Sequence, residues 1–161
     1  QPKVMQWEQI VYSLHFYSGA DPLFSDEKGL ADHLKRSKEV LRLAEMVQER
    51  HQVPVYFGEF STMGNHANDI EGMRHFLTLF NQKGYHWSPW TWKYVDDDQE
   101  GTIWGLYQFN QPWPRTPNIH RDSLESLLEL VSLLNMDHFS VQRPYAKVLQ
   151  ECLAQPIQAA R

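Results

Sequence analysis

Two kinds of hydrophobic pattern alternate along this chain and predict its secondary structure. Short apolar runs rich in β-branched and aromatic residues, typical of buried strands, occur at residues 9–16, 53–58 and 85–91. Apolar positions at helical spacing predict helices over about residues 30–52, 70–84, 122–134 and 144–153. This β-α-β-α-β-α order with a terminal helix is typical of a parallel sheet, and right-handed crossovers would place the intervening helices on one side of it.

Each predicted strand ends in side chains that can carry chemistry. They are His15 and Tyr17 on the first strand, Glu59 on the second, and Trp90, Trp92 and Lys93 on the third. Because the carboxyl ends of parallel strands meet at one edge, we expect these groups to share a site. A lone buried carboxylate is costly, so Glu59 should face a cavity. Two simpler interpretations stay open: Glu59 as a solvated strand end or half of a structural ion pair, and His15 as a hydrogen-bonded core histidine.

The charge and the aromatic content of the chain limit the kinds of molecule that it is expected to bind. The formal net charge of -5 is spread without long runs, which argues against nucleic acid or an anionic membrane surface as a partner. No apolar stretch approaches the roughly 20 residues that a membrane-spanning helix needs. The six Trp, seven Tyr and eight Phe suit a sugar-binding cleft, although aromatic residues also fill ordinary cores.

The cysteine and histidine positions predict no metal site. The single cysteine, Cys152, excludes an internal disulfide, and its place in the terminal amphipathic helix predicts a buried structural thiol. His66, His75 and His86 lack the spacing of metal ligands, so no metal or other cofactor is expected.

Three motifs in order carry a family resemblance. The segments YSLHFY, PVYFGEF and HWSPWTWK resemble the last three strands of family 5 glycoside hydrolases, which are cellulase-like β-glycan hydrolases with a (β/α)8 barrel, and the resemblance spans about residues 9–135. It implies that Glu59, in a Gly-Glu-Phe motif, is the nucleophile and that His15 and Tyr17 match the His-x-Tyr of the sixth strand. Trp90 matches the platform under the sugar, with Trp92 and Lys93 as further substrate-binding candidates.

The resemblance also implies an architecture and a reaction. Residues 1–161 would be the C-terminal portion of a single barrel domain, namely the last three β/α units (strands 6–8) plus a terminal helix, with the N-terminal strands absent from this chain. The reaction would be retaining hydrolysis of β-linked glucans or related β-glycosides, on an oligo- or polysaccharide, without a cofactor. An extracellular location is favoured through the family.

The sequence departs from the family pattern at the second catalytic carboxyl. The family's acid/base Glu lies in an Asn-Glu-Pro motif on the fourth strand, and this motif does not occur here. Glu8 precedes its strand and would fall at the opposite end of the barrel, while Asp96, Asp97, Asp98 and Glu100 lie on a predicted loop. We therefore expect half of a catalytic pair and an isolated fragment without activity.

Two other functional classes remain compatible with these residues. One is a non-catalytic carbohydrate-binding or scaffold half-barrel that keeps the aromatic platform, and the other is an unrelated α/β domain. In a three-stranded part of a barrel, Leu14, Val55 and Phe57 would face inward without an opposite wall. We therefore expect cover from a missing N-terminal barrel segment, a second chain or a self-dimer.

Overall fold

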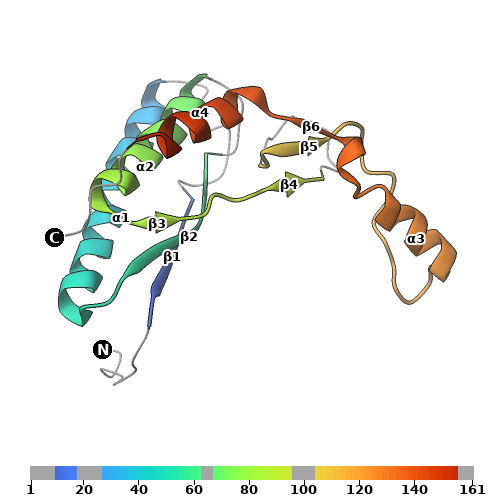
Figure 1. Cartoon of the computed structure of the whole chain (residues 1–161), viewed down its shortest axis with the longest axis horizontal. Helices are drawn as coiled ribbons and strands as arrows, with labels where there is room; N and C mark the ends of the chain where they lie inside the picture. Colours follow the sequence, from blue (N-terminus) through green and yellow to red (C-terminus); the bar gives the residue numbers. More distant parts are fainter. Residues whose placement is uncertain (1–9, 18–26, 63–66, 96–103, 156–161) are drawn as a thin grey trace.

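The first sheet is parallel, as the order of the elements predicted. The computed structural model describes residues 10–17, 27–62, 67–95 and 104–155. Strands β1 (Tyr12–Tyr17), β2 (Val55–Ser61) and β3 (His86–Trp87) pair in the order β1-β2-β3, with both pairings parallel (Figure 1). The expectation of an α/β fold with a parallel sheet is therefore confirmed.

The third strand is shorter than predicted because its pairing becomes irregular. Beyond β3 the chain still follows β2, through hydrogen bonds from the Ser88 amide to the Phe57 carbonyl and from the Trp90 amide to the Phe60 carbonyl, both 2.9 Å. These bonds hold Trp90 beside the carboxyl end of β2. The irregular segment therefore still delivers its aromatic side chains to the edge where β1 and β2 end.

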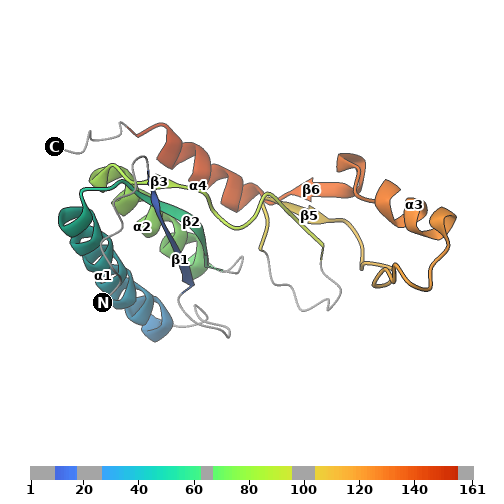
Figure 2. The same cartoon turned by 90° about the horizontal axis from the view of Figure 1, so that it is seen from below.

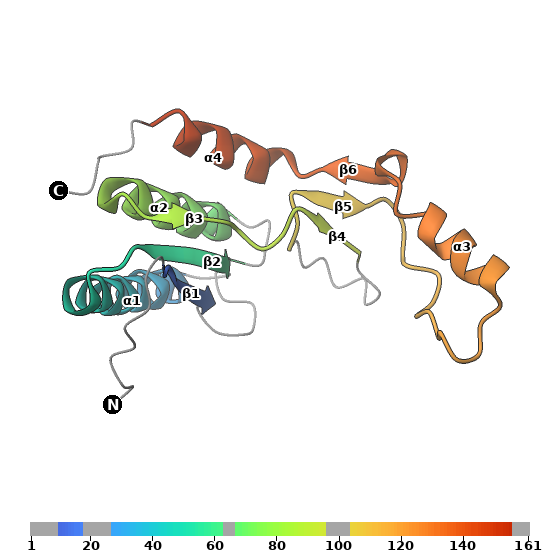
Figure 3. The same cartoon turned by 60° about the horizontal axis from the view of Figure 1, so that its bottom comes forward.

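Three helices lie on one side of this sheet. They are α1 (Glu27–His51), α2 (Ala67–Lys83) and α4 (Arg143–Leu153), and Figures 2 and 3 show them along the same face of β1–β3. Helix α2 ends at Lys83 and is followed by Gly84, whose φ of 69° is a left-handed conformation that glycine adopts without strain. Among the described helices, none combines the length and the apolar character that crossing a membrane requires.

The core lies between the sheet and these helices, and it is built mainly from phenylalanine. Phe57 stacks on Phe80 at 4.1 Å between ring centroids, and Phe60 meets Phe80 edge-on at 5.0 Å. Val55 and Phe57 are 2% and 0% exposed, and Leu14 packs against the same cluster. The expectation that these three residues would lack a covering wall is wrong, because they face the helices rather than the opposite side of the sheet.

One buried asparagine joins α2, α4 and β3. Asn81 is 4% exposed; its amide nitrogen donates to the Cys152 carbonyl at 2.7 Å, and its oxygen accepts from the Trp87 indole at 3.0 Å. The Cys152 thiol is fully buried, as predicted, and burial raises its pKa above the ordinary range. Trp87 therefore serves packing rather than ligand binding.

A second small sheet and a helix extend away from this body, and the hydrophobic pattern did not predict the sheet. Strand β4 (Lys93–Tyr94) pairs in parallel with β5 (Tyr107–Phe109), which pairs antiparallel with β6 (Phe139–Val141) after a short 3-10 turn (Met136–His138). Helix α3 (Leu124–Ser132) lies at the far end (Figure 1). We call residues 93–95 and 104–142 the arm.

Helix α3 differs from its prediction in two ways. Its N-cap is Ser123, whose hydroxyl accepts from the Ser126 amide, while Asp122 accepts from the Asn118 amide before the helix begins. The helix therefore starts at Leu124, after residue 122 at which the apolar pattern predicted its start. Its apolar stripe is also exposed, at 72% for Leu124, 57% for Leu128 and 59% for Val131.

Candidate active site

An irregularity in β2 positions Glu59. Leu14 pairs with Phe57 and His15 pairs with Glu59, so Gly58 is an extra residue in the register, as in a β-bulge. A Cβ atom at Gly58 would lie 2.6 Å from the Ser13 hydroxyl oxygen, so a glycine lets β1 approach this closely. The shift places the Glu59 and His15 side chains on the face of the sheet away from the helices.

Tyr17 donates a hydrogen bond to Glu59. The Tyr17 hydroxyl lies 3.0 Å from the Glu59 Oε2 atom, within the distance that a direct bond requires. Burial, followed by the hydrogen bond and the charge of Glu59, raises the pKa of Tyr17 well above its ordinary value of 10.0. The phenol therefore stays protonated and remains a donor to the carboxylate.

His15 approaches the same carboxylate oxygen. Its Nδ1 atom lies 3.4 Å from Glu59 Oε2, and its side chain is 53% exposed while that of Glu59 is 31% exposed. The interpretation of His15 as a core histidine is therefore wrong. The exposed imidazole can reach both the carboxylate and a molecule that approaches it.

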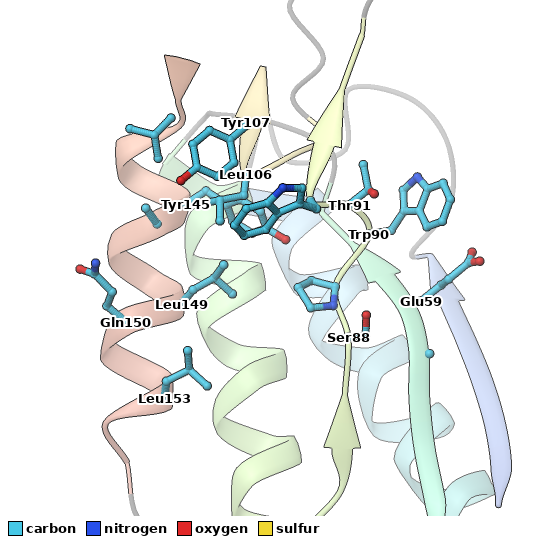
Figure 4. A pocket seen from close by; sticks show the side chains of 15 residues that line it. Glu59, Ser88, Trp90, Thr91, Leu106, Tyr107, Tyr145, Leu149, Gln150 and Leu153 are labelled. Atoms are coloured by element: carbon cyan, nitrogen blue, oxygen red, sulfur yellow. The ribbon is translucent and has the colours of Figure 1, made fainter. Parts of the chain in front are cut away.

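Glu59 and Trp90 line one cavity of about 660 Å³. In Figure 4, Glu59 and Trp90 lie toward one end of this cavity, and Leu149 and Leu153 of α4 lie toward the other. The Trp90 side chain is 44% exposed, so an aromatic face is open to a ligand beside the carboxylate. Tyr17 and His15 contact Glu59 from β1 and are not among the residues that line the cavity.

The remaining two predicted residues have different environments. Trp92 is 61% exposed, lines the same cavity and packs against Tyr107 at 4.9 Å between ring centroids. Lys93 instead donates to the Leu134 carbonyl, and its ammonium lies 4.6 Å from the centroid of the Phe139 ring. These contacts direct Lys93 into the arm rather than toward Glu59.

Two aromatic residues near the site were missed by the sequence patterns. The Trp104 ring meets the Tyr17 ring edge-on at 5.8 Å between centroids. Tyr145 of α4 lines the cavity, is 7% exposed, and its hydroxyl has no hydrogen-bond partner among the described residues. Neither lies at the end of a predicted strand, so the pattern that selected Tyr17 and Glu59 did not select them.

The described residues contain no group of three or more His, Cys, Asp or Glu side chains that could hold a metal ion. His75 and His86 are described, whereas His66 lies outside the described residues. The carboxylates considered as a second catalytic group, Glu8, Asp96, Asp97, Asp98 and Glu100, also lie outside them. The site that the structure describes therefore has one carboxylate with a phenol and an imidazole beside it.

Comparison with known proteins assigns a family to this geometry. A search of curated proteins finds no match. The family model described as cellulase (glycosyl hydrolase family 5) matches residues 1–96, which include β1, β2, β3 and Trp90 but not the strands β5 and β6 of the arm. The matched residues include Tyr17 and Glu59, which are hydrogen-bonded at the carboxyl ends of two parallel strands. The chain therefore belongs to glycosyl hydrolase family 5, the cellulase family.

Proposed function

We propose that this chain carries the nucleophile half of a retaining β-glycosidase site, with Glu59 as the nucleophile. The most direct support is the 3.0 Å hydrogen bond from Tyr17 to a Glu59 carboxylate that is 31% exposed, in a member of a glycoside hydrolase family. A nucleophile must be ionised and reachable, and a phenol donor favours a charged carboxylate without covering it. The substrate class that follows is a β-linked oligo- or polysaccharide.

The barrel assignment is part of the proposal. Family membership implies a (β/α)8 barrel, and residues 1–161 would supply its last three β/α units, strands 6–8, as the C-terminal portion of one domain. The remaining strands would come from a further segment or another chain. That part would also bring the acid/base carboxyl, about 5–5.5 Å from Glu59 in a retaining enzyme.

The reaction divides into two steps. A Glu59 oxygen forms a bond to the anomeric carbon as the glycosidic C–O bond breaks, and the departing oxygen takes a proton from the acid/base carboxyl. A water then attacks the same carbon, gives its proton to that carboxyl, and releases Glu59. Tyr17 would keep Glu59 oriented for the first step, and Trp90 would stack under the sugar.

The deciding experiment is turnover of an activated aryl β-glycoside by the protein as its gene encodes it. Glu59→Gln should lower kcat by about 10⁴-fold or more, because the amide cannot displace the leaving group, while binding of the sugar stays within a few fold. Glu49→Gln, an exposed carboxylate change in α1, is the matched control and should leave turnover unchanged. Wild-type turnover in Glu59→Gln would show that Glu59 is only a solvated strand end.

Two further readouts separate the mechanism from its alternative. A fluorinated activated glycoside that traps the covalent intermediate should add one sugar to the peptide that contains Glu59, as detected by mass spectrometry. NMR of the first product should show the β anomer for a retaining reaction. Sugar binding by the wild-type protein with neither turnover nor trapping would instead select the non-catalytic carbohydrate-binding or scaffold half-barrel, which the exposed Trp90 and Trp92 rings also suit.

A further inference from the structure

We infer that Trp104 of the arm is a positioning residue for the nucleophile, because it holds the Tyr17 phenol in the orientation that donates to Glu59. This inference rests on the proposed function of Glu59 and adds a residue outside the family match, which ends at residue 96. Among the described residues, the Tyr17 side chain has two directional contacts. One is its hydrogen bond to Glu59, and the other is the edge-to-face contact between its ring and the Trp104 ring.

Tyr17 needs such a support because of its place in the strand. It is the last residue of β1, and its side chain is only partly buried. A phenol at the end of a strand keeps several rotamers that the backbone does not exclude. The Trp104 ring lies at 62° to the Tyr17 ring with 5.8 Å between centroids, which is the preferred edge-to-face arrangement of aromatic pairs.

Two backbone hydrogen bonds join the segment of Trp104 to Thr91. The Trp104 carbonyl accepts from the Thr91 amide at 2.7 Å, directly after the segment that carries Trp90, and the Thr91 carbonyl accepts from Leu106 at 2.9 Å. Gly105 lies between these two bonds and is buried, and a Cβ there would lie 2.9 Å from the backbone nitrogen of Tyr94. Only a glycine lets this part of the arm pack so closely against β4.

Trp104 therefore connects the arm to the nucleophile through a short series of contacts. The Tyr94 ring lies 6.5 Å from the Trp104 ring, the Trp104 ring contacts Tyr17, and Tyr17 donates to Glu59. Trp104 contacts Tyr17, and Tyr17 in turn bonds Glu59, so the effect of Trp104 on the carboxylate passes through the phenol. Loss of the edge contact should release Tyr17 into other rotamers for part of the time.

A double-mutant cycle tests this path on turnover of the aryl β-glycoside. Tyr17→Phe removes a hydrogen bond to a charged group and should lower kcat by about tenfold to a hundredfold. Trp104→Ala should lower kcat by roughly threefold to tenfold with KM within twofold, and Trp104→Phe should restore kcat because it keeps an aromatic edge. If Trp104 acts through Tyr17, the double variant should match Tyr17→Phe alone.

Each other result overturns the inference. Fully additive losses in the double variant would show that Trp104 acts on its own, and a rise in KM at constant kcat would make it a sugar platform. Trp113→Ala is the matched control: this arm tryptophan packs on Phe109 at 5.2 Å, and its loss should leave turnover unchanged. An equal loss of turnover in Trp113→Ala would show that the Trp104 substitution acts through general unfolding of the arm.

The cycle also distinguishes this inference from the proposed function. Wild-type turnover in Glu59→Gln overturns both, whereas loss of turnover in Glu59→Gln with additive Tyr17 and Trp104 effects overturns only the role of Trp104. Fluorine NMR of a fluorotyrosine at position 17 gives a readout without turnover. Glu59→Gln should move this resonance in the wild-type background and move it much less in Trp104→Ala, and an equal movement in both would overturn the inference.

Discussion

The candidate site shows how a carboxylate can be kept usable at the end of a buried strand. Phe57 and Phe60 of β2 are fully buried against the helices, and the extra residue Gly58 turns Glu59 to the opposite face of the sheet. There the carboxylate accepts from Tyr17 and lies near His15 instead of entering the apolar core. This arrangement avoids the cost of burying an unpaired charge and leaves one side of Glu59 open.

Substitution of Trp90 should change KM and kcat in a different way from substitution of Glu59. The Trp90 ring is 44% exposed beside the carboxylate, so stacking on a sugar would stabilise the ground state and the transition state alike. Trp90→Ala should therefore raise KM by about tenfold and lower kcat/KM by a similar factor or more, with less effect on kcat than Glu59→Gln. Steady-state kinetics and calorimetry of oligosaccharide binding measure both effects.

Trp87→Phe is the control for this comparison, because that indole packs in the core and donates to Asn81. It should change thermal stability rather than KM. Unchanged sugar affinity in Trp90→Ala would contradict the platform role.

The packing of α1 on α2 depends on a buried histidine. His33 is 1% exposed, its Nε2 atom donates to the Gly72 carbonyl at 3.3 Å, and its ring meets Phe76 edge-on at 4.4 Å. Burial lowers the pKa of His33 to about 4, and the charge of nearby His75 acts in the same direction. His75 also has a lowered pKa, through burial and then the charge of Lys38.

These shifts predict that the helical layer loses stability in mild acid. The folded His33 binds its proton near pH 4, whereas the unfolded one binds it near 6.5, so the unfolded state takes up more protons between these values. The stabilisation is complete above the unfolded pKa and is lost as the pH falls. Between pH 7 and pH 5 the free energy of unfolding should drop by about 2 kcal/mol from His33, with His75 adding to it.

Urea denaturation of the chain at several pH values measures this loss. His33→Gln, which keeps a donor for Gly72 but does not titrate, should give a flatter pH dependence over the same interval. An unchanged slope in His33→Gln would mean that other groups cause the acid sensitivity.

In the part of the chain that the structure describes, the three-stranded parallel sheet ends in an open edge at β3. In the order β1-β2-β3, strand β3 has no partner on its outer edge among the described strands, and α4 lies beyond α2 on the same side. The cavity between α4 and residues 88–92 is lined by exposed apolar side chains, with Trp92 61% and Leu153 69% exposed. We therefore expect any covering segment or chain at this edge rather than over Val55 and Phe57.

We predict that the 161-residue chain produced alone associates through this edge or requires another segment or chain to cover it. Burial of a side chain such as Trp92 or Leu153 contributes about 1.5–3 kcal/mol. Sedimentation velocity at increasing concentration should show association. Leu153→Glu should reduce it, while Leu43→Glu, an equally drastic change at an exposed position of α1, should not. A stable, monodisperse monomer at every concentration would contradict this prediction.

Periodic patterns predicted the parts of this protein that local chemistry decides. The six- and seven-residue strands β1 and β2 and the helices α1, α2 and α4 appeared in the sequence because a long element repeats its apolar positions. Tyr17 and Glu59 were found for a related reason: a polar group directly after a buried run must lie at a strand end, and parallel ends meet. The hydrogen bond between them confirms this placement.

The arm, the covered face of β2 and the position of Trp104 depended on contacts between residues that are far apart in the sequence. Strands β4, β5 and β6 have two or three residues each, too few to show a period, so the arm is defined by pairing alone. The prediction that Phe57 would lack cover was also wrong. Alternation along β2 shows which residues share a face, but it does not show which face the helices pack against. Trp104 reaches Tyr17 across 87 positions of sequence through backbone bonds to Thr91, and only the folded chain brings such partners together.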